Sequence, residues 1–208
     1  MKYIFLLVTL FILAACSKEK GYGRFNLRDG QEVELLVSHH YGAINDAPLL
    51  LPQKESAELP LSDFKDREPG YNYKIKAKMV AYNGPELMDG GPSDGLQFIK
   101  IINREKYTGN DSFEISLIRS FVPGPPQIIL WKEEDKYLIN IGTKIQLTYS
   151  DKKVGDQLQE IWQYNQKRLT DYSLVALPLK WKSIQATVTH DPKNFGKAYL
   201  VSNVKLVE

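Results

Sequence analysis

The feature that most restricts the fold of this chain is a strict alternation of apolar and polar residues over residues 71–82, YNYKIKAKMVAY. Successive side chains of a β-strand point to opposite faces of a sheet, so a period of two residues predicts a strand with one buried face. The predicted buried face carries Tyr73, Ile75, Ala77 and Met79, and the opposite face carries three lysines.

The same period recurs along the rest of the chain. Two apolar runs without alternation, residues 96–102 and 127–131, predict strands that are more fully buried. Clusters of Gly, Pro and Asp separate the segments. The pattern predicts a mainly β domain, built as an antiparallel sandwich or as barrel-like sheets. The alternating segments that predict further strands are residues 33–37, 113–117, 145–149, 184–188 and 198–206.

One segment has the spacing of a helix instead. Between residues 156 and 169, apolar residues recur at roughly helical intervals. Asp156 near the start and Lys167 near the end suit the charges of a helix dipole. We therefore expect one α-helix near residues 156–169, packed on the sheet through Ile161 and Trp162.

The N-terminal residues differ in kind from the rest of the chain. Lys2 supplies a positive charge, and residues 3–15 carry no charge. This apolar run is shorter than the roughly 20 residues that a membrane-spanning helix needs, and it suits the core of a secretory signal peptide. The run ends in an aliphatic residue and two small residues before a cysteine, Leu13-Ala14-Ala15-Cys16. This ending resembles the lipobox of bacterial lipoproteins.

The lipobox resemblance implies that residues 1–15 are a signal peptide and that Cys16 carries lipid after cleavage. Small side chains fit a peptidase cleft, the thiol accepts a diacylglycerol, and the freed amine accepts a further acyl chain. Each buried CH₂ contributes about 0.8 kcal/mol and stable anchoring takes two chains, so a lipidated Cys16 holds the protein at a membrane. The alternative is a secreted protein with a chance cysteine at its cleavage site.

The residues around Cys16 support the predicted anchor. It is the only cysteine of the chain, so an exported domain has no internal disulfide and depends on its core for stability. Residues 16–24 are polar and contain glycine, which predicts a flexible tether. Directly after Cys16 stands Ser17. An acidic residue at this position would resemble an inner-membrane retention signal, and serine does not. This favours the outer membrane of a bacterial cell envelope, on its periplasmic or its surface side.

The folded domain is expected to span residues 25–208. This length suits one domain, and a division into two subdomains near residue 105 stays open. The Pro-rich residues 41–66 predict a long loop or short edge strands.

A second resemblance covers residues 61–102, which contain LSDFKDREPGYNYKIKAKMV and then SDGLQFIKII. Phe64 and the turn Glu68-Pro69-Gly70-Tyr71 lead into the alternating strand, and Asp94 precedes the next apolar run. The stretch is similar to an uncharacterised class of bacterial exported domains, some of which occur beside domains of the HslJ/META type. The resemblance implies a small β-rich envelope domain and no particular activity.

The charge pattern argues against one class of function. The chain has 27 Lys and Arg residues against 25 Asp and Glu residues, spread along its length. A nucleic-acid binder concentrates its basic residues on one face, so no nucleic-acid partner is expected.

The adjacent residues His39 and His40 are candidate metal ligands. Neighbouring side chains on a strand point to opposite faces, so a metal site would need a further ligand such as Asp46, brought close by folding. His190 lies far away in the sequence. Two polar residues that close a strand are the ordinary interpretation, and neither a metal ion nor a cofactor is predicted.

Other catalytic or binding motifs are weak. The loop Asp89–Asp94, DGGPSD, has oxygen ligands that suit Ca²⁺ but lacks the acidic spacing of an EF-hand, and a solvated hairpin connection is the simpler interpretation. The chain has no Gly-x-Ser-x-Gly elbow and no phosphate-binding loop that ends in Gly-Lys-Ser/Thr. Many carboxylates are present, and any two could be juxtaposed as in a glycosidase. No catalytic residue is predicted.

Aromatic residues are a better indication of a binding surface. The chain has three Trp and 12 Tyr residues, and aromatic side chains on a β-sheet stack on sugars or anchor a protein partner. The candidates for ligand binding are Trp131, Trp181 and Tyr107, and Tyr22 and Tyr41 are also expected to be exposed. The alternative is that these side chains fill the core and its rim.

These patterns together predict a non-catalytic binding or interaction module, held at a membrane by lipid, with a protein or a glycan of the cell envelope as its partner. The alternative is an envelope hydrolase that uses clustered carboxylates or a His-bound metal. A purely structural lipoprotein is a third interpretation. A deep polar pocket where titratable groups converge would indicate the enzyme, whereas an exposed aromatic patch or a groove without that convergence would indicate binding.

Overall fold

The computed structural model describes four stretches of the chain, residues 20–84, 93–120, 124–171 and 177–208. The predicted signal peptide, Cys16 and the first four residues of the loop Asp89–Asp94 lie outside them. Within the four stretches, no helix combines the length and the apolar character that a membrane crossing requires.

The first sheet comes from the N-terminal half of the chain and has the strand order β3-β2-β1-β5-β6-β4. Its strands pair antiparallel, except that β4 runs parallel to β6. The predicted buried face of the alternating segment is confirmed, because Tyr73, Ile75, Ala77 and Met79 are at most 1% exposed. The six strands are β1 (Glu32–Val37), β2 (Leu49–Leu50), β3 (Glu55–Ser56), β4 (Leu61–Ser62), β5 (Tyr71–Val80) and β6 (Gly95–Lys106).

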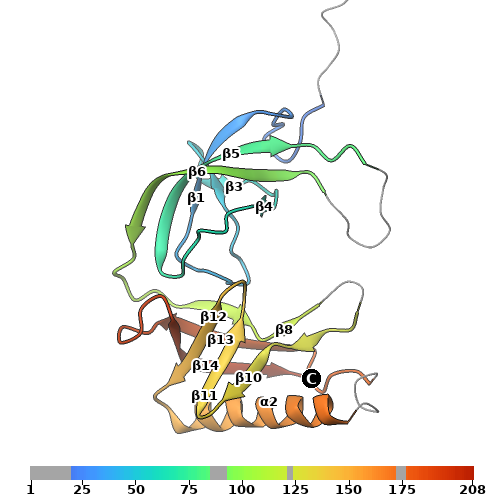
Figure 1. Cartoon of the computed structure of the whole chain (residues 1–208), viewed down its shortest axis with the longest axis vertical. Coiled ribbons are helices and arrows are strands. Elements are labelled where there is room, and N and C mark those ends of the chain that lie inside the picture. The colour runs from blue at the N-terminus through green and yellow to red at the C-terminus, as the bar shows by residue number, and fades with distance from the viewer. Residues whose placement is uncertain (1–19, 85–92, 121–123, 172–176) are drawn as a thin grey trace, which may run out of the picture.

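The second sheet comes from the C-terminal half and has the order β10-β11-β12-β14-β13-β7. Only β12 and β14 pair in parallel within it. A short antiparallel ribbon of β8 (Ile118–Arg119) and β9 (Gln127–Ile128) lies beside it. The predicted mainly β, mainly antiparallel fold is confirmed (Figure 1). The strands of the second sheet are β7 (Phe113–Ser116), β10 (Leu130–Glu133), β11 (Lys136–Asn140), β12 (Lys144–Tyr149), β13 (Ser183–His190) and β14 (Ala198–Val207).

The helix α2 (Lys152–Thr170) is the one helix of the described stretches, and it lies against the second sheet (Figure 1). It starts four residues before the predicted segment because Asp151 caps it, accepting a hydrogen bond from the Lys153 amide at 2.6 Å. Ile161 is buried and Trp162 is half-buried against the sheet core, as expected.

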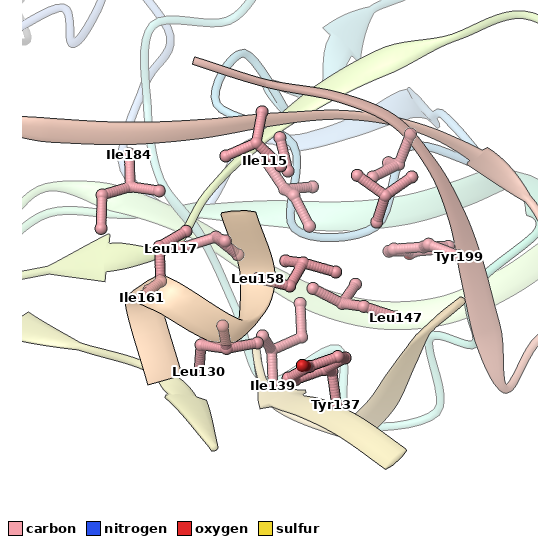
Figure 2. Close-up of a cluster of buried hydrophobic side chains, with 14 of the residues drawn as sticks. Ile115, Leu117, Leu130, Tyr137, Ile139, Leu147, Leu158, Ile161, Ile184 and Tyr199 are labelled. Carbon is pink, nitrogen blue, oxygen red and sulfur yellow. The ribbon is translucent and has the colours of Figure 1, made fainter. Parts of the chain in front are cut away.

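The buried apolar residues form two clusters, one on each sheet. One cluster is formed by buried side chains from residues between 27 and 96, and the other by buried side chains from residues between 113 and 204. The second cluster includes the buried face of α2. Figure 2 shows part of the second cluster, where Leu158 and Ile161 of the helix meet Leu130 and Ile139 of the sheet. The two clusters fall on either side of residue 105, and the division of the domain into two subdomains near that residue stays a prediction.

The prediction of a fully buried strand at residues 96–102 is wrong. Leu96 is fully buried, but Ile99, Ile101 and Ile102 are 40%, 37% and 42% exposed. The reason is that β4 pairs only with the first residues of β6, Leu96 and Gln97. Within the described stretches, the rest of β6 forms an edge of the first sheet.

Candidate binding site at the junction of the two sheets

The segment that joins β1 to β2, residues 38–48, connects the two sheets. Its backbone reaches β7, where Ala43 forms a bridge with Ile115 and the Ile44 amide donates to the Glu114 carbonyl at 2.8 Å. The Tyr199 hydroxyl donates to the carbonyl of Tyr41 at 2.8 Å. We call residues 38–48 the junction segment.

Two histidines from different sheets meet at the start of the junction segment. His39 follows the end of β1 and His190 ends β13, and their Nδ1 and Nε2 atoms lie 2.9 Å apart. The two residues are only 5% and 9% exposed. One ring therefore donates a hydrogen bond to the other in a buried position.

Aromatic rings surround the histidine pair. The Tyr107 ring stacks on His39 with centroids 3.4 Å apart and an interplanar angle of 7°. Phe113, Phe195 and Tyr199 place their ring centroids 5.5–5.6 Å from that of His190. The pair thus lies in a largely apolar environment, shared by residues of both sheets.

This environment keeps the histidines neutral. Burial, together with the smaller effects of the neighbouring His40 and His190, lowers the pKa of His39 to about 4. Burial and His40 likewise lower the pKa of His190 to about 4. Burial also lowers the pKa of His40. At neutral pH the cluster therefore carries no charge, and a proton added to it enters an apolar site.

The structure corrects the interpretation of His39 and His40 as two residues on opposite faces of a strand. Strand β1 ends at Val37, so both histidines belong to the junction segment, and their ring centroids lie 4.0 Å apart. His190 is brought to the pair despite its distance in the sequence. Among the described residues, no group of three His, Cys, Asp or Glu side chains is placed to hold a metal ion.

Asp46, the proposed third metal ligand, instead forms an ion pair with Arg67. Their Oδ1 and Nη2 atoms are 2.7 Å apart, and the two side chains are 13% and 15% exposed. The same Nη2 donates to the Ser38 carbonyl at 2.9 Å, and the Gly42 amide donates to Asp46 at 3.2 Å. These contacts tie both ends of the junction segment to one guanidinium group.

Two hollows border the junction segment. The first, of about 820 Å³, lies beside the Arg67–Asp46 pair and reaches Phe64 and Ile141. The second, of about 580 Å³, lies between the segment and strands β1, β5 and β6. We call the second one the sheet hollow. Both volumes fall in the range of small-ligand sites.

The sheet hollow combines apolar walls with a few polar groups. Its neutral polar groups include the amides of Asn45, Asn72 and Asn103, the hydroxyl of Ser38 and the imidazole of His40, whose buried Nε2 has no hydrogen-bond partner among the described residues. Its charged groups, Lys74 and Glu105, already have partners in Glu34 and Asn103. The apolar part of the lining comes from Leu36, Val37, Ala47 and Leu49.

The three aromatic residues predicted to bind a ligand do not lie together. Trp181 is 2% exposed and packs edge-on against Tyr164 in the second core, so the alternative role of core filling applies to it. Trp131 is half-buried on β10, and its indole N–H donates to Glu133 at 3.1 Å. Tyr107 is half-buried and covers His39.

The other two tyrosines expected to be exposed, Tyr22 and Tyr41, are half-buried as well. Tyr41 lies beneath the guanidinium group of Arg67, whose carbon is 5.1 Å from the ring centroid. Sequence reasoning missed Arg67 altogether, since no spacing in the sequence relates it to Asp46.

Comparison of the chain with family models, with curated proteins and with solved structures finds no match.

Proposed function

We propose that this chain is a membrane-anchored lipoprotein of the bacterial cell envelope, whose folded body acts as a non-catalytic binding module. The lipobox sequence that ends at Cys16 supports the anchor. The hollows at the junction segment support the binding role.

One observation carries the binding role, namely that the converging titratable groups are buried away from solvent. His39 and His190 are hydrogen-bonded to each other and surrounded by aromatic rings. An acid–base catalyst has to reach its substrate. The rings of His39 and His190 contact each other and the neighbouring aromatic side chains, and they are almost fully buried. The sheet hollow, in contrast, presents amides and apolar side chains that suit binding.

The lining of the sheet hollow indicates the chemistry of its ligand. Three amides and an imidazole offer hydrogen bonds without net charge, and its lysine and glutamate balance each other. A neutral ligand with hydrogen-bonding groups and one apolar side fits such a surface. A segment of an envelope protein or glycan has this character, and it would reach the module while the lipid holds the body near the membrane.

Filling the sheet hollow tests this function. Ala47 is exposed and lines the hollow, so Ala47→Trp places an indole in it. The full lipidated chain is used as bait in detergent-dissolved membranes, and the retained protein and glycan are measured. We expect Ala47→Trp to lose the component that the unaltered chain retains, while Gln163→Trp, at an exposed position of α2, keeps it. Equal retention by both variants would contradict binding in this hollow.

A further inference from the structure

The two halves of the chain are joined by few elements. Strands β1–β6 precede residue 107 and strands β7–β14 follow residue 112, so the chain passes between the halves once, through residues 107–112. In the described stretches the sheets meet through connecting segments, and no strand of one sheet packs extensively on a strand of the other (Figure 1). Each sheet has its own buried cluster. Separation at the junction segment would therefore leave most of both clusters buried.

All three histidines of the chain lie where the halves meet. His39 and His190 come from different halves and share the 2.9 Å hydrogen bond, and the ring centroid of His40 lies 4.0 Å from that of His39. Histidine is the side chain whose ordinary pKa lies between pH 5 and pH 8. The groups that ordinarily titrate in this range are therefore concentrated at one contact between the halves.

The closed junction leaves polar atoms unsatisfied. Among the described residues, three buried side-chain nitrogen or oxygen atoms have no hydrogen-bond partner, and all three lie around the junction segment: His40 Nε2, His190 Nδ1 and Arg67 Nε. A buried polar atom without a partner costs free energy that contact with water would restore. This cost favours opening of the junction, and the hydrogen bond between His39 and His190 opposes it.

We propose that His39 and His190 form a latch that holds the two halves together at neutral pH and that acid releases. In the released state the halves separate about residues 107–112, and each half keeps its own core.

Protonation of both rings turns the latch contact into a repulsion. In the neutral pair one nitrogen donates and the other accepts. When both rings are protonated every ring nitrogen is a donor, so the hydrogen bond is lost and two positive charges lie in an apolar site. Opening exposes both rings to water. With a pKa of about 4 in the closed state and 6.5 when exposed, each histidine shifts the equilibrium toward the open state about 30-fold at pH 5.

The charged groups that face the histidines compensate the added protons only in part. Asp46 is held by Arg67. Asp191, next to His190, accepts hydrogen bonds from Thr148, Asn194 and the Lys193 amide. Asp111 favours the charged forms of His39 and His40, but burial has the larger effect on their pKa. The remaining titratable groups around the cluster are Tyr41, Tyr107, Tyr199 and, over the Phe195 ring, Lys106.

The test measures the distance between the halves. The full chain with Cys16→Ser, which removes the only native thiol, receives Lys100→Cys on β6 and Gln163→Cys on α2, both at exposed positions, for a fluorescent donor and acceptor. We expect the energy transfer to fall as the pH is lowered from 7 to 4, with a midpoint between pH 4 and pH 6.5. Through this transition, the far-UV circular dichroism and the tryptophan emission of the unlabelled chain should keep their values at pH 7.

Variants assign the transition to the latch. His190→Gln keeps a side chain that can hydrogen-bond to His39 and carries no charge, so it should lower the midpoint by at least half a pH unit. His39→Gln makes the same change from the other half of the chain and should have the same effect. The control Lys193→Gln introduces the same side chain at an exposed position three residues after His190, and it should leave the midpoint unchanged.

Three outcomes would overturn the proposal. The first is energy transfer that stays constant down to pH 4. The second is a transition that coincides with changes in circular dichroism and tryptophan emission, which would show unfolding of the cores. The third is a midpoint that both His190→Gln and His39→Gln leave in place, which would assign the transition to carboxylates such as Asp46.

The latch also adjoins the sheet hollow. Ser38 and His40 line this hollow, so release of the latch moves part of its wall. Binding in the hollow would then depend on pH, a consequence that rests on the proposed function. The distance measurement uses neither lipid nor ligand, so failure of the latch and failure of the proposed function are distinguishable.

Discussion

His39 Nδ1 and His190 Nε2 lie 2.9 Å apart, although the two residues are 151 positions apart in the sequence. The pair links the end of β1 in the first sheet to the end of β13 in the second. Since burial keeps both rings neutral, this contact makes the stability of the junction depend on pH.

Acidification should destabilise the protein between about pH 6.5 and pH 4. The pKa of each histidine is about 4 in the folded chain and 6.5 in the unfolded chain, so the unfolded chain binds more protons in this window. Stability rises with pH wherever the unfolded state binds more protons. At pH 5 the loss relative to pH 7 is about 2 kcal/mol for one such histidine. Urea unfolding at both pH values measures it.

The variant His190→Phe serves as the control for this pH dependence. It removes the titrating group at that position and keeps an aromatic ring of similar shape among Phe113, Phe195 and Tyr199. The decrease in unfolding free energy from pH 7 to pH 5 should become smaller in the variant. An unchanged decrease would show that other groups are responsible.

Loss of Arg67 should destabilise the junction segment. Arg67→Met leaves Asp46 as a largely buried carboxylate without its cation, a change that typically costs about 3–5 kcal/mol. Arg67→Lys should restore only part of this loss, because both hydrogen bonds come from the terminal Nη2 of the longer arginine side chain, whose guanidinium group also lies over the Tyr41 ring. The measurement is the free energy of unfolding in urea.

An exposed ion pair provides the comparison for Arg67. The side chains of Arg24 and Glu55 are 54% and 48% exposed, so Glu55→Gln should cost less than about 1 kcal/mol. Equal losses for Glu55→Gln and Arg67→Met would contradict a special role for the buried pair.

Removal of the predicted lipidation site should release the protein from membranes. Cys16→Ser eliminates the only thiol that can accept a diacylglycerol, and without acyl chains the chain has lost its predicted anchor. Fractionation should place the variant in a soluble or an unprocessed form, and mass spectrometry of the unaltered protein should show added acyl mass. A variant that is processed and sediments with membranes as before would refute the anchor.

Trp181 and Trp131 should respond differently to truncation. Trp181 is fully buried in the second core, so Trp181→Ala should cost about 3–5 kcal/mol of unfolding free energy. Trp131 is half-buried at the end strand β10 of its sheet, and Trp131→Ala should cost clearly less. Thermal or urea unfolding compares them, and a larger loss for Trp131 would contradict the assignment of Trp181 to the core.

Local patterns in the sequence predicted the local structure well. The alternation over residues 71–82 predicted β5 and its buried face, because a strand's side-chain period depends only on its own backbone. The helical spacing predicted α2 within a few residues, and the cap at Asp151 extended it. The Pro-rich residues 41–66 predicted a long loop or short edge strands, and the structure shows three short strands there, β2, β3 and β4.

The sequence by itself determined most of the elements, the buried faces of β5, β7 and β13, and the residues that suit a lipid anchor, because these properties depend on neighbours along the chain. Only the tertiary structure decided that His39 meets His190, that Asp46 pairs with Arg67, and that the apolar residues of β6 lie at an open edge. These outcomes depend on which strands become neighbours in space. That choice follows from the packing of the whole chain, and no local spacing encodes it.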